Sequence, residues 1–576
     1  MKPKKRKGAK IECDGSANRL ALLSISTQKG TVAEYLFFLI QNLYSVYKHI
    51  YVISSYSFDQ ESLQRMQQYA DIIIEDVAGD DFQHWKMALE SLRRDNQLNS
   101  FEDLVLINDS IYGPFVSLNE VFEKMDAEKV DFWGITRHQA MPGTTDFIQT
   151  YFIDFKIKKI WKDLLLFFDS MDGIANRELE LSHFLETKEY SSDVFVRTDD
   201  IENRDPRLAE SFFMFYPYFL VKERKCPFVS RYMFSLDDKI MSLYGSENQI
   251  PLFLEYIDDK YPCEYIYEDL ICQYNMYDLV HRLKLNFILN GNARARKQKS
   301  RRKVAVFVYL YYERDFLLYI ERLRVFPKEI SIYIYTDTET KVNALLKMTY
   351  ENEIKAKVCK VDGRGREWAT FLNEISQASE QYDYGAFLHD KSFHDNEFPT
   401  QAYAFRDLLW DNLIPSEEGV KQIINIFECK EYIGLLLPPI VKHGSYFKYY
   451  MNFWTCNYKN TLELARKLDI KEELIVEEVT PISIGGMFWF RVDALRKIFT
   501  HNMERSAFCK EPMPTDGTLN HSLERIIPYV AQDAGYYSGI VITQRYLQID
   551  WMVQAHMVRV LGSNLGEIPD FMCELQ

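Results

Sequence analysis

The stretch Glu102-Asp-Leu-Val-Leu-Ile-Asn-Asp-Ser-Ile-Tyr-Gly-Pro-Phe115 decides the expected fold. Its apolar run ends in Asn108 and Asp109, and Tyr-Gly-Pro stops it. A short continuous apolar run closed by turn residues is typical of a buried parallel strand. Because ligands of open α/β sheets bind at the carboxyl ends of such strands, Asp109 is expected where a ligand would lie.

A second copy of this pattern occurs at Tyr384-Gly-Ala-Phe-Leu-His-Asp-Lys391, with His389 and Asp390 in the terminal position. Upstream, Asp81-Phe82-x-x-Trp85 and Glu367-Trp368-x-x-Phe371 precede equivalent helices at a similar distance from the two strand ends. The order of the parts is the same in both halves. The sequence therefore predicts an internal duplication, with two similar domains in tandem.

Strands and helices alternate in each half, which predicts an α/β fold with mainly parallel, doubly wound sheets. The expected strands of the first half are 19–26, 49–55, 70–75, 102–109, 130–138 and 149–155. Those of the second half are 303–311, 330–335, 356–361 and 384–390. Residues 234–289 are expected to be mainly helical and to pack back on the first sheet.

Charge is unevenly distributed along the 576 residues, whose net charge is −15. Basic runs at Lys2–Lys10 and Arg294–Lys303 divide the chain into a tail (1–17), a first domain (18–292), a linker (293–302) and a second domain (303–576). The acidic total argues against nucleic-acid binding. The basic runs are either solvated connections or contacts for anionic lipid head groups.

The nine cysteines are scattered without C-x-x-C spacing, which favours a reducing cytoplasm over a disulfide framework or a zinc site. We find no apolar leader and no uninterrupted apolar run of about 18 residues, the length of a spanning helix. The expected location is therefore cytoplasmic or peripheral at the membrane.

An acidic residue at a central strand end can hold a nucleotide-sugar when a divalent cation or basic side chains neutralise the diphosphate. Asp109 and Asp390 are the candidate ligands of Mg²⁺ or Mn²⁺, and Asn108 and His389 offer one neutral ligand each. Neither site has an Asp-x-Asp pair, and a single Asp after a strand is also a common turn former. Metal dependence stays open at this stage.

An inverting sugar transfer needs one base to take the proton of the acceptor hydroxyl. In the second half Glu524 is the candidate, with His521 one turn before it, although a surface glutamate paired with Arg525 fits equally well. In the first half the candidates are Glu178 and Glu180. Acidic residues in a first helical turn are favoured by the helix dipole alone, so that signal is weaker.

Other polar and glycine-rich loops supply candidate binding residues. Arg364 and Arg366 stand beside glycines and could grip phosphate as bidentate donors, unless they form an exposed basic loop. The Gly485-Gly486 pair precedes an aromatic segment containing Trp489, which suits either sugar stacking or core packing. Asp337 follows a predicted strand and is a further donor-binding candidate.

Several strings of the sequence resemble the bacterial rhamnan synthesis protein F family over nearly the whole chain. They are LVLINDSIYGPF, VDFWGITRH, HDKS, GGMFWFRVDAL and HSLERIIPYVAQDAGYYSG. The resemblance implies tandem nucleotide-diphospho-sugar transferase (GT-A-like) domains in a cytoplasmic glycosyltransferase, peripheral at the inner face of the cell membrane. It also implies dTDP-L-rhamnose as donor, a lipid-linked saccharide acceptor of cell-wall or capsular polysaccharide, and contact with other polysaccharide-synthesis enzymes.

The family motifs correspond to Asp81, Asn108, Asp109, His389, Asp390 and Glu524 of this chain. Two departures occur, because the chain has Gly-Asp-Asp-Phe where Gly-Tyr-Asp-Phe is usual, and Asp390 where threonine is frequent. The expected roles combine motif and residue arguments. Catalytic residues are Asp109, Glu178 and Glu524; donor-binding residues are Asp81, Asn108, Asp109, Asp337, Arg364, Arg366, His389 and Asp390; acceptor-binding residues are Gly486, Trp489 and His521.

Three hypotheses remain at this stage. Both halves are catalytic and form different linkages, or one half is a degenerate transferase fold that binds polymer or a partner enzyme. The third is a nucleotide-sugar binding or scaffold protein without turnover.

Overall fold

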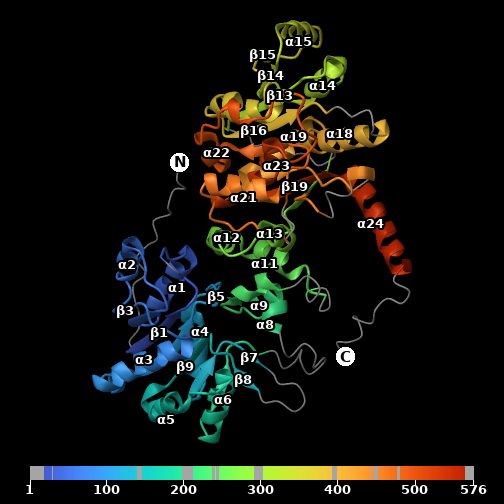
Figure 1. The fold of residues 1–576 in the computed structure, drawn as a ribbon. Coiled ribbons are helices and arrows are strands. Elements are labelled where there is room, and N and C mark those ends of the chain that lie inside the picture. The colour runs from blue at the N-terminus through green and yellow to red at the C-terminus, as the bar shows by residue number, and fades with distance from the viewer. Residues whose placement is uncertain are drawn as a thin grey trace. The chain divides into compact units, whose positions relative to one another are not determined.

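The computed structural model describes residues 18–28, 30–138, 146–197, 212–236, 241, 245–290, 302–391, 398–442, 444–446, 452–476 and 481–564. The expected basic tail (1–17) and all but the last residue of the expected linker (293–302) lie outside these residues. The chain forms two compact units, residues 1–269 and 270–576. Each unit is built on its own sheet (Figure 1).

The sheet of the first unit has the strand order β10-β6-β9-β4-β1-β2-β3. Its strands are β1 (Arg19–Ile25), β2 (His49–Ser54), β3 (Ile72–Ile74), β4 (Asp103–Asn108), β6 (Phe132–Gly134), β9 (Phe152–Phe155) and β10 (Ser192–Val194). Strands β3, β2, β1 and β4 are parallel, and β9 runs antiparallel between β4 and β6. The stretch that predicts the fold is thus β4, buried at every residue near the centre of the sheet.

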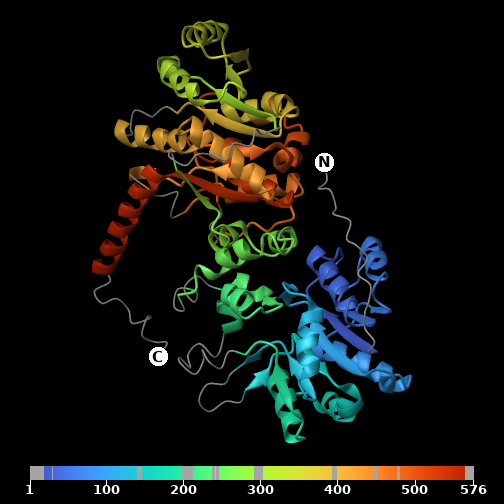
Figure 2. The same cartoon turned by 180° about the vertical axis from the view of Figure 1, so that it is seen from behind.

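Helices cover both faces of this sheet (Figures 1 and 2). The described helices are α1 (Glu34–Tyr44), α2 (Gln60–Met66), α3 (Asp81–Arg94), α4 (Leu118–Ala127), α5 (Ile157–Ser170), α6 (Arg177–Thr187), α8 (Phe212–Phe215), α9 (Pro217–Glu223), α11 (Gln249–Ile257) and α12 (Glu264–Ile271). Alternate residues of β1 and β4 form one core with α3, α5 and α6. On the other face Phe122 of α4 packs on Trp133 of β6, with ring centroids 5.1 Å apart.

The sheet of the second unit repeats this topology and adds one strand, in the order β12-β19-β17-β18-β16-β13-β14-β15. Its strands are β12 (Asn286–Leu289), β13 (Val304–Tyr309), β14 (Ser331–Thr336), β15 (Ala356–Lys360), β16 (Tyr384–His389), β17 (Ile433–Leu437), β18 (Phe488–Arg491) and β19 (Tyr537–Thr543). Strands β15, β14, β13 and β16 are parallel, and β18 is antiparallel to β16 and β17. The predicted duplication is therefore visible in the strand order, with β16 in the place of β4 and β18 in the place of β9.

The helices of the second unit are α13 (Met276–Arg282), α14 (Phe316–Arg322), α15 (Glu339–Glu351), α16 (Arg366–Thr370), α17 (Ser376–Ser379), α18 (Pro399–Leu413), α19 (Glu417–Cys429), α21 (Tyr458–Lys467), α22 (Arg496–Thr500), α23 (Leu519–Asp533) and α24 (Gln544–Asn564). Two of the helices that lead into predicted sites begin with a capping box. Asp80 and Gln83 satisfy the first turn of α3, and Thr518 and His521 satisfy that of α23. The predicted α/β class with mainly parallel sheets is confirmed.

The boundary between the units differs from the expected linker. Residues 270–289 were expected in the first domain, but they belong to the second unit, where β12 pairs in parallel with β19. The Gln532 side chain of α23 also donates to the carbonyls of Ile271 and Tyr274. A segment that precedes the basic run thus completes the sheet that follows it. Composition alone gives no signal for this, because strand pairing across the run is a tertiary contact.

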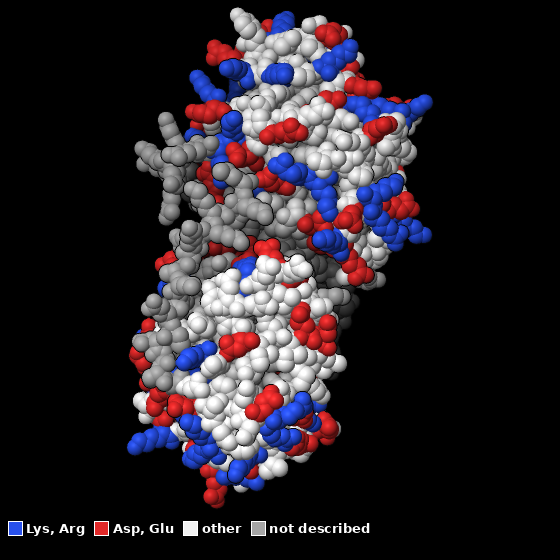
Figure 3. All heavy atoms as spheres, turned by 90° about the vertical axis from the view of Figure 1, so that its left-hand side faces the viewer, with Lys and Arg blue, Asp and Glu red and all other residues white. Residues whose placement is uncertain are grey.

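Charged side chains of both signs are interspersed at short range on the face shown in Figure 3. Among the described helices, none combines the length and the apolar composition needed to cross a bilayer.

Candidate functional site

The two strand ends are equivalent by register. Ser24 of β1 lies opposite Asn108 of β4, and Tyr309 of β13 lies opposite His389 of β16. Asn108 and Asp109 in the first unit therefore correspond to His389 and Asp390 in the second. Both pairs lie at the carboxyl edge of their sheet, where open α/β sheets bind ligands.

Asp109 fastens the loop that follows β1. Its Oδ2 accepts hydrogen bonds from the Thr27 amide (2.9 Å) and hydroxyl (2.6 Å), and its Oδ1 accepts one from the Ser26 hydroxyl (3.3 Å). The residue is 1% exposed. Asp109 is thus placed at the predicted edge, but its carboxylate already has three donors from its own unit.

Asp81 at the start of α3 lies at the same edge. It accepts from the hydroxyl of Ser24 (2.6 Å) and from the side-chain amide of Asn108 (2.8 Å). Burial, with a smaller contribution from the charge of Asp109, raises the pKa of Asp81 to about 6. The structure therefore brings Asp81, Asn108 and Asp109 together. The same cluster includes Ser24, which the sequence argument did not select.

The sequence argument also did not identify a buried ion pair that contacts the backbone of Asp109. The guanidinium of Arg231 pairs with the carboxylate of Asp269 (2.9 Å) and donates to the Asp109 carbonyl (2.9 Å) and the Thr27 hydroxyl (2.8 Å). The hydroxyl of Tyr112 also donates to Asp269. The ion pair therefore holds the backbone of the strand end. No sequence signal links residues so far apart in the chain.

Glu178, the candidate base of the first unit, lies in the first turn of α6. Its Oε1 accepts hydrogen bonds from the amide of Thr150, at 3.0 Å, and from the hydroxyl of the same residue. The carboxylate is therefore engaged with the segment before β9. A role as base would require these bonds to be exchanged for one from an acceptor hydroxyl.

In the second unit Asp390 repeats the arrangement of Asp109. Its Oδ2 accepts from the backbone amides of Tyr311 and Tyr312, each at 2.6 Å. Burial raises the pKa of Asp390 to about 7, against the two amides, which lower it. The two strand-end aspartates share one structural task, which is to anchor the loop after the first strand of their sheet.

His389 is buried between two carbonyl groups. Its Nε2 lies 2.7 Å from the carbonyl oxygen of Gly485, and its Nδ1 lies 2.8 Å from that of Asp390. Burial lowers the pKa of His389 to about 4, so the ring is neutral near pH 7 and one of its nitrogens donates. The imidazole thereby fixes the Gly485-Gly486 turn against the strand end.

Glu524 lies on α23, and charges from this helix and from the strand-end edge act on it. Its carboxylate is 3.7 Å from Arg525, and its side chain is 15% exposed. Burial raises the pKa of Glu524, whereas the positive charges of Lys391, Arg525 and His521 lower it. Glu367, the counterpart of Asp81, acts on Glu524, His389 and Asp390 through its negative charge. Glu524, His389 and Asp390 are therefore all within electrostatic reach of Glu367, and Glu524 and His389 are within reach of Lys391; the sequence argument selected neither Glu367 nor Lys391.

The remaining predicted binding residues of the second unit have partners within it. Arg364 donates to the carbonyls of Ser506 and Phe508, and Arg366 forms a bidentate pair with Glu511 (2.6 and 2.8 Å). Asp337 pairs with Lys341 at 2.7 Å. These two arginines hold the 505–511 segment, so a grip on phosphate would require them to exchange partners.

The acceptor-binding candidates are similarly engaged. Trp489 is 0% exposed, and its Nε1 donates to the Leu413 carbonyl at 2.9 Å, so it is a core side chain and presents no ring face for a sugar. His521 completes the capping box of α23, where its Nδ1 lies 2.8 Å from the Thr518 hydroxyl. Packing accounts for the aromatic segment, as the alternative interpretation of the sequence held.

Gly486 packs tightly on the site. Its φ is +70°, and a Cβ there would lie 3.2 Å from His389 Nε2 and 3.2 Å from Trp368 Nε1. We expect Gly486→Ala to destabilise the second unit by about 2 kcal/mol, because left-handed backbone strain and crowding add. Gly535→Ala is the matched control, since Gly535 has φ +83° and a Cβ added there would meet nothing within 4 Å. Equal shifts of the thermal midpoint in the two variants would contradict the crowding argument.

The two aspartates predicted as metal ligands do not gather a ligand set around them. In the part of the chain that the structure describes, no group of three or more His, Cys, Asp or Glu side chains is arranged to hold an ion. Asp109 and Asp390 each use carboxylate oxygens to accept from backbone amides. The donor set among the described residues is therefore poor for Mg²⁺ or Mn²⁺, which prefer several oxygen ligands.

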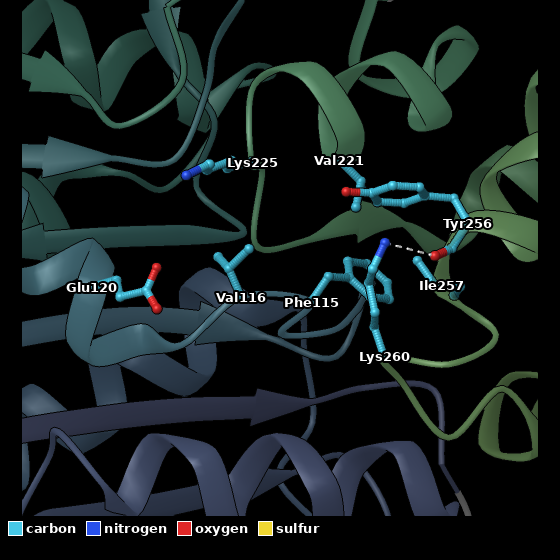
Figure 4. Close-up of a pocket in the computed structure, with 8 residues that line it drawn as sticks. All are labelled: Phe115, Val116, Glu120, Val221, Lys225, Tyr256, Ile257 and Lys260. Carbon is cyan, nitrogen blue, oxygen red and sulfur yellow. Dashed lines mark hydrogen bonds between the residues drawn. The ribbon is translucent and has the colours of Figure 1, made fainter.

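A cavity of about 190 Å³ lies elsewhere in the first unit. Its lining residues come from the segment after β5 (Ile111–Tyr112), from α4, and from α9, α11 and the loops that follow them. Figure 4 shows the Lys260 ammonium donating to the carbonyl of Tyr256, next to Phe115. None of the predicted site residues lines this cavity.

Comparison with known proteins places the chain in a family. The model of the family described as rhamnan synthesis protein F matches residues 50–536. A curated relative, the uncharacterized protein WxcX of Xanthomonas campestris pv. campestris (strain B100), is 25% identical over 214 residues, and the match spans 36% of this chain and 28% of that protein.

Solved structures with similarity to the chain include three proteins at 12% identity and a TM-score of 0.23. The glycosyltransferase GlyE of Streptococcus pneumoniae TIGR4 aligns over 68% of this chain and 88% of its own. S. aureus TarS 1-349 aligns over 42% and 58%, respectively. Glucosyl-3-phosphoglycerate synthase of Mycobacterium tuberculosis aligns over 42% and 71%.

Proposed function

The chain belongs to the rhamnan synthesis protein F family, and from this premise we propose that it is an inverting rhamnosyltransferase of polysaccharide synthesis. The proposed donor is dTDP-L-rhamnose, and the proposed acceptor is a lipid-linked, rhamnose-containing cell-wall or capsular saccharide. Support comes from the family match, from two α/β units of one topology, and from polar clusters at the ligand-binding edge of each. A lipid-linked acceptor would bring the protein to the inner face of the membrane.

We place the transfer in the second unit, with Glu524 as base. The observation that carries this assignment is the position of Glu524 on α23, where its side chain is 15% exposed and the charge of Lys391, at the strand end that also contains His389, acts on it. The acceptor oxygen attacks the anomeric carbon, and the bond from that carbon to the diphosphate oxygen breaks, leaving its electron pair on the diphosphate. Glu524 takes the hydroxyl proton. A single displacement converts a β-linked donor into an α-rhamnoside.

The pH dependence of transfer follows from the state of this carboxylate. Burial raises the pKa of Glu524, and only the ionised form accepts a proton. Activity should therefore fall as the pH drops through a pKa above the ordinary glutamate value, and reach a plateau at higher pH. Measuring kcat/KM from pH 4 to 8 tests this. If kcat/KM does not fall toward pH 4 while circular dichroism shows the fold intact, Glu524 is not the base.

For the first unit we favour binding of polymer or a partner over a second transfer. Glu178 already accepts two hydrogen bonds from Thr150, and Asp109 accepts three from the loop after β1. Glu178→Gln, which keeps an oxygen for Thr150, should therefore leave every product linkage unchanged. Methylation analysis of the product tests this. Loss of one linkage type in the variant would show instead that both units are catalytic.

A donor screen tests the class of reaction. Purified full-length protein is incubated with several nucleotide-sugars and a rhamnose-primed lipid-mimic acceptor, with and without EDTA, and release of nucleoside diphosphate is followed. Turnover with dTDP-L-rhamnose supports the proposal, and the EDTA arm decides whether Mg²⁺ or Mn²⁺ takes part. Binding without turnover of any donor would favour a nucleotide-sugar binding protein.

A further inference from the structure

Lys391 follows Asp390 directly at the carboxyl end of β16, the edge at which the proposed transfer takes place. Its backbone amide is held by the hydroxyl of Tyr319 at 3.0 Å. Its ammonium lies 5.7 Å from the ring centroid of Phe405. That ring abuts the Gly485 turn, whose carbonyl contacts His389. The side chain is thus held over the strand end beside the Gly485-Gly486 turn.

The ammonium also lies within electrostatic reach of the proposed base. Lys391 is the strongest of the positive charges acting on Glu524, and it acts on His389 as well. Among the described residues, Lys391 and Glu524 do not form an ion pair with each other. Nucleophile and leaving group occupy opposite sides of the anomeric carbon in a single displacement, so a base and a leaving-group cation should be near each other but separate.

Other cations around this edge are neutralised or engaged within the second unit. Lys341 pairs with Asp337, Arg366 with Glu511 and Arg406 with Asp407. Arg364 and Arg525 donate to carbonyl oxygens. Within the described residues, the Lys391 ammonium has neither a carboxylate nor a carbonyl partner, and it contacts the Phe405 ring.

We propose that Lys391 binds the diphosphate of the donor and stabilises the charge on the departing nucleoside diphosphate. This inference rests on the proposed function. When the bond from the anomeric carbon to oxygen breaks, the electron pair stays on that diphosphate oxygen, and the ammonium offsets the new charge without giving up its proton. A positioned cation at a developing oxyanion is a large contribution to catalysis. In the first unit the same position is Ser110, whose hydroxyl donates to Asn108 at 2.6 Å, so that unit has no equivalent cation there.

The test uses full-length protein with Lys391→Met, Lys391→Gln and Lys391→Arg, and Lys347→Met as control on the exposed surface of α15. Two readouts are taken: steady-state transfer from dTDP-L-rhamnose, and calorimetric binding of dTDP. We expect Lys391→Met and Lys391→Gln to lower kcat/KM about 100-fold, in line with loss of one oxyanion contact, and to weaken dTDP binding. Lys391→Arg should retain most of the kcat/KM and of the dTDP affinity, because the positive charge is kept. Lys347→Met should match the wild type in both measurements.

The outcomes separate this inference from the function on which it rests. If the wild type transfers rhamnose and the folded Lys391→Met and Lys391→Gln variants transfer it equally well, the role of Lys391 is overturned and the function stands. Equal dTDP affinity in the wild type and these variants also overturns the inference, even without turnover. If the wild type neither binds dTDP nor turns over dTDP-L-rhamnose, the proposed function fails, and the role of Lys391 fails with it.

Discussion

Glu524→Gln is expected to reduce rhamnosyl transfer by about 1,000-fold while leaving the fold intact. The amide cannot take the proton of the acceptor hydroxyl, and removal of a positioned base typically costs 10²–10⁴-fold in rate, so a value of about 1,000 lies in the middle. Within the described residues the carboxylate has one ion pair, with Arg525 at 3.7 Å, and so its loss should cost little stability. The measurement is kcat with dTDP-L-rhamnose and a rhamnose-primed acceptor.

Glu463→Gln is the matched control, because Glu463 is an exposed residue on α21 of the same unit. Its activity should equal that of the wild type. Full activity of a folded Glu524→Gln variant would remove Glu524 from the mechanism. It would also make Glu367 the next candidate base, because its charge acts on both His389 and Asp390.

Arg231→Met is expected to destabilise the first unit by about 3–5 kcal/mol. The substitution leaves the carboxylate of Asp269 buried without its cation. An uncompensated buried charge strongly lowers the free energy of unfolding. The substitution also removes the donor to the Asp109 carbonyl and the Thr27 hydroxyl. Denaturant unfolding of full-length protein should show the transition of this unit shifting to lower denaturant, with the transition of the second unit unchanged.

Two further variants make this prediction specific. Arg93→Met removes an exposed pair with Asp169 (3.2 Å) in the same unit and should cost less than about 1 kcal/mol. The double variant Arg231→Met/Asp269→Leu should recover much of the loss, because no uncompensated charge remains buried. If Arg231→Met costs no more than Arg93→Met, the ion pair does not stabilise the strand end.

The duplication and the two strand ends were predictable because they rest on local pattern. An apolar run that ends in a polar pair defines β4 and β16 without knowledge of the partners. Asp81 was selected through the family resemblance, and it lies beside Asn108 and Asp109 because the strand ends and the start of α3 meet at one edge of the sheet.

Other features depend on contacts that the sequence does not encode locally. Trp489 resembles an exposed platform in the sequence, but β18 lies between β16 and β17 and is buried on both faces. Arg364 and Arg366 resemble a phosphate grip, yet their partners are residues 506–511, about 145 positions along the chain. The pairing of β12 with β19 is of the same kind. In each case the role of a residue is determined by contacts with a segment far away in the sequence. Its neighbours in the sequence indicate a different role.

The most direct measurement of the central claim is the anomeric configuration of the product. Full-length protein is supplied with dTDP-β-L-rhamnose and a rhamnose-primed acceptor, and the extended product is examined by mass spectrometry and NMR. A single displacement with Glu524 as base predicts an acceptor extended by α-linked rhamnose, with one dTDP released for each residue added. A β-linked product, or no extension while another nucleotide-sugar is used, would contradict the account.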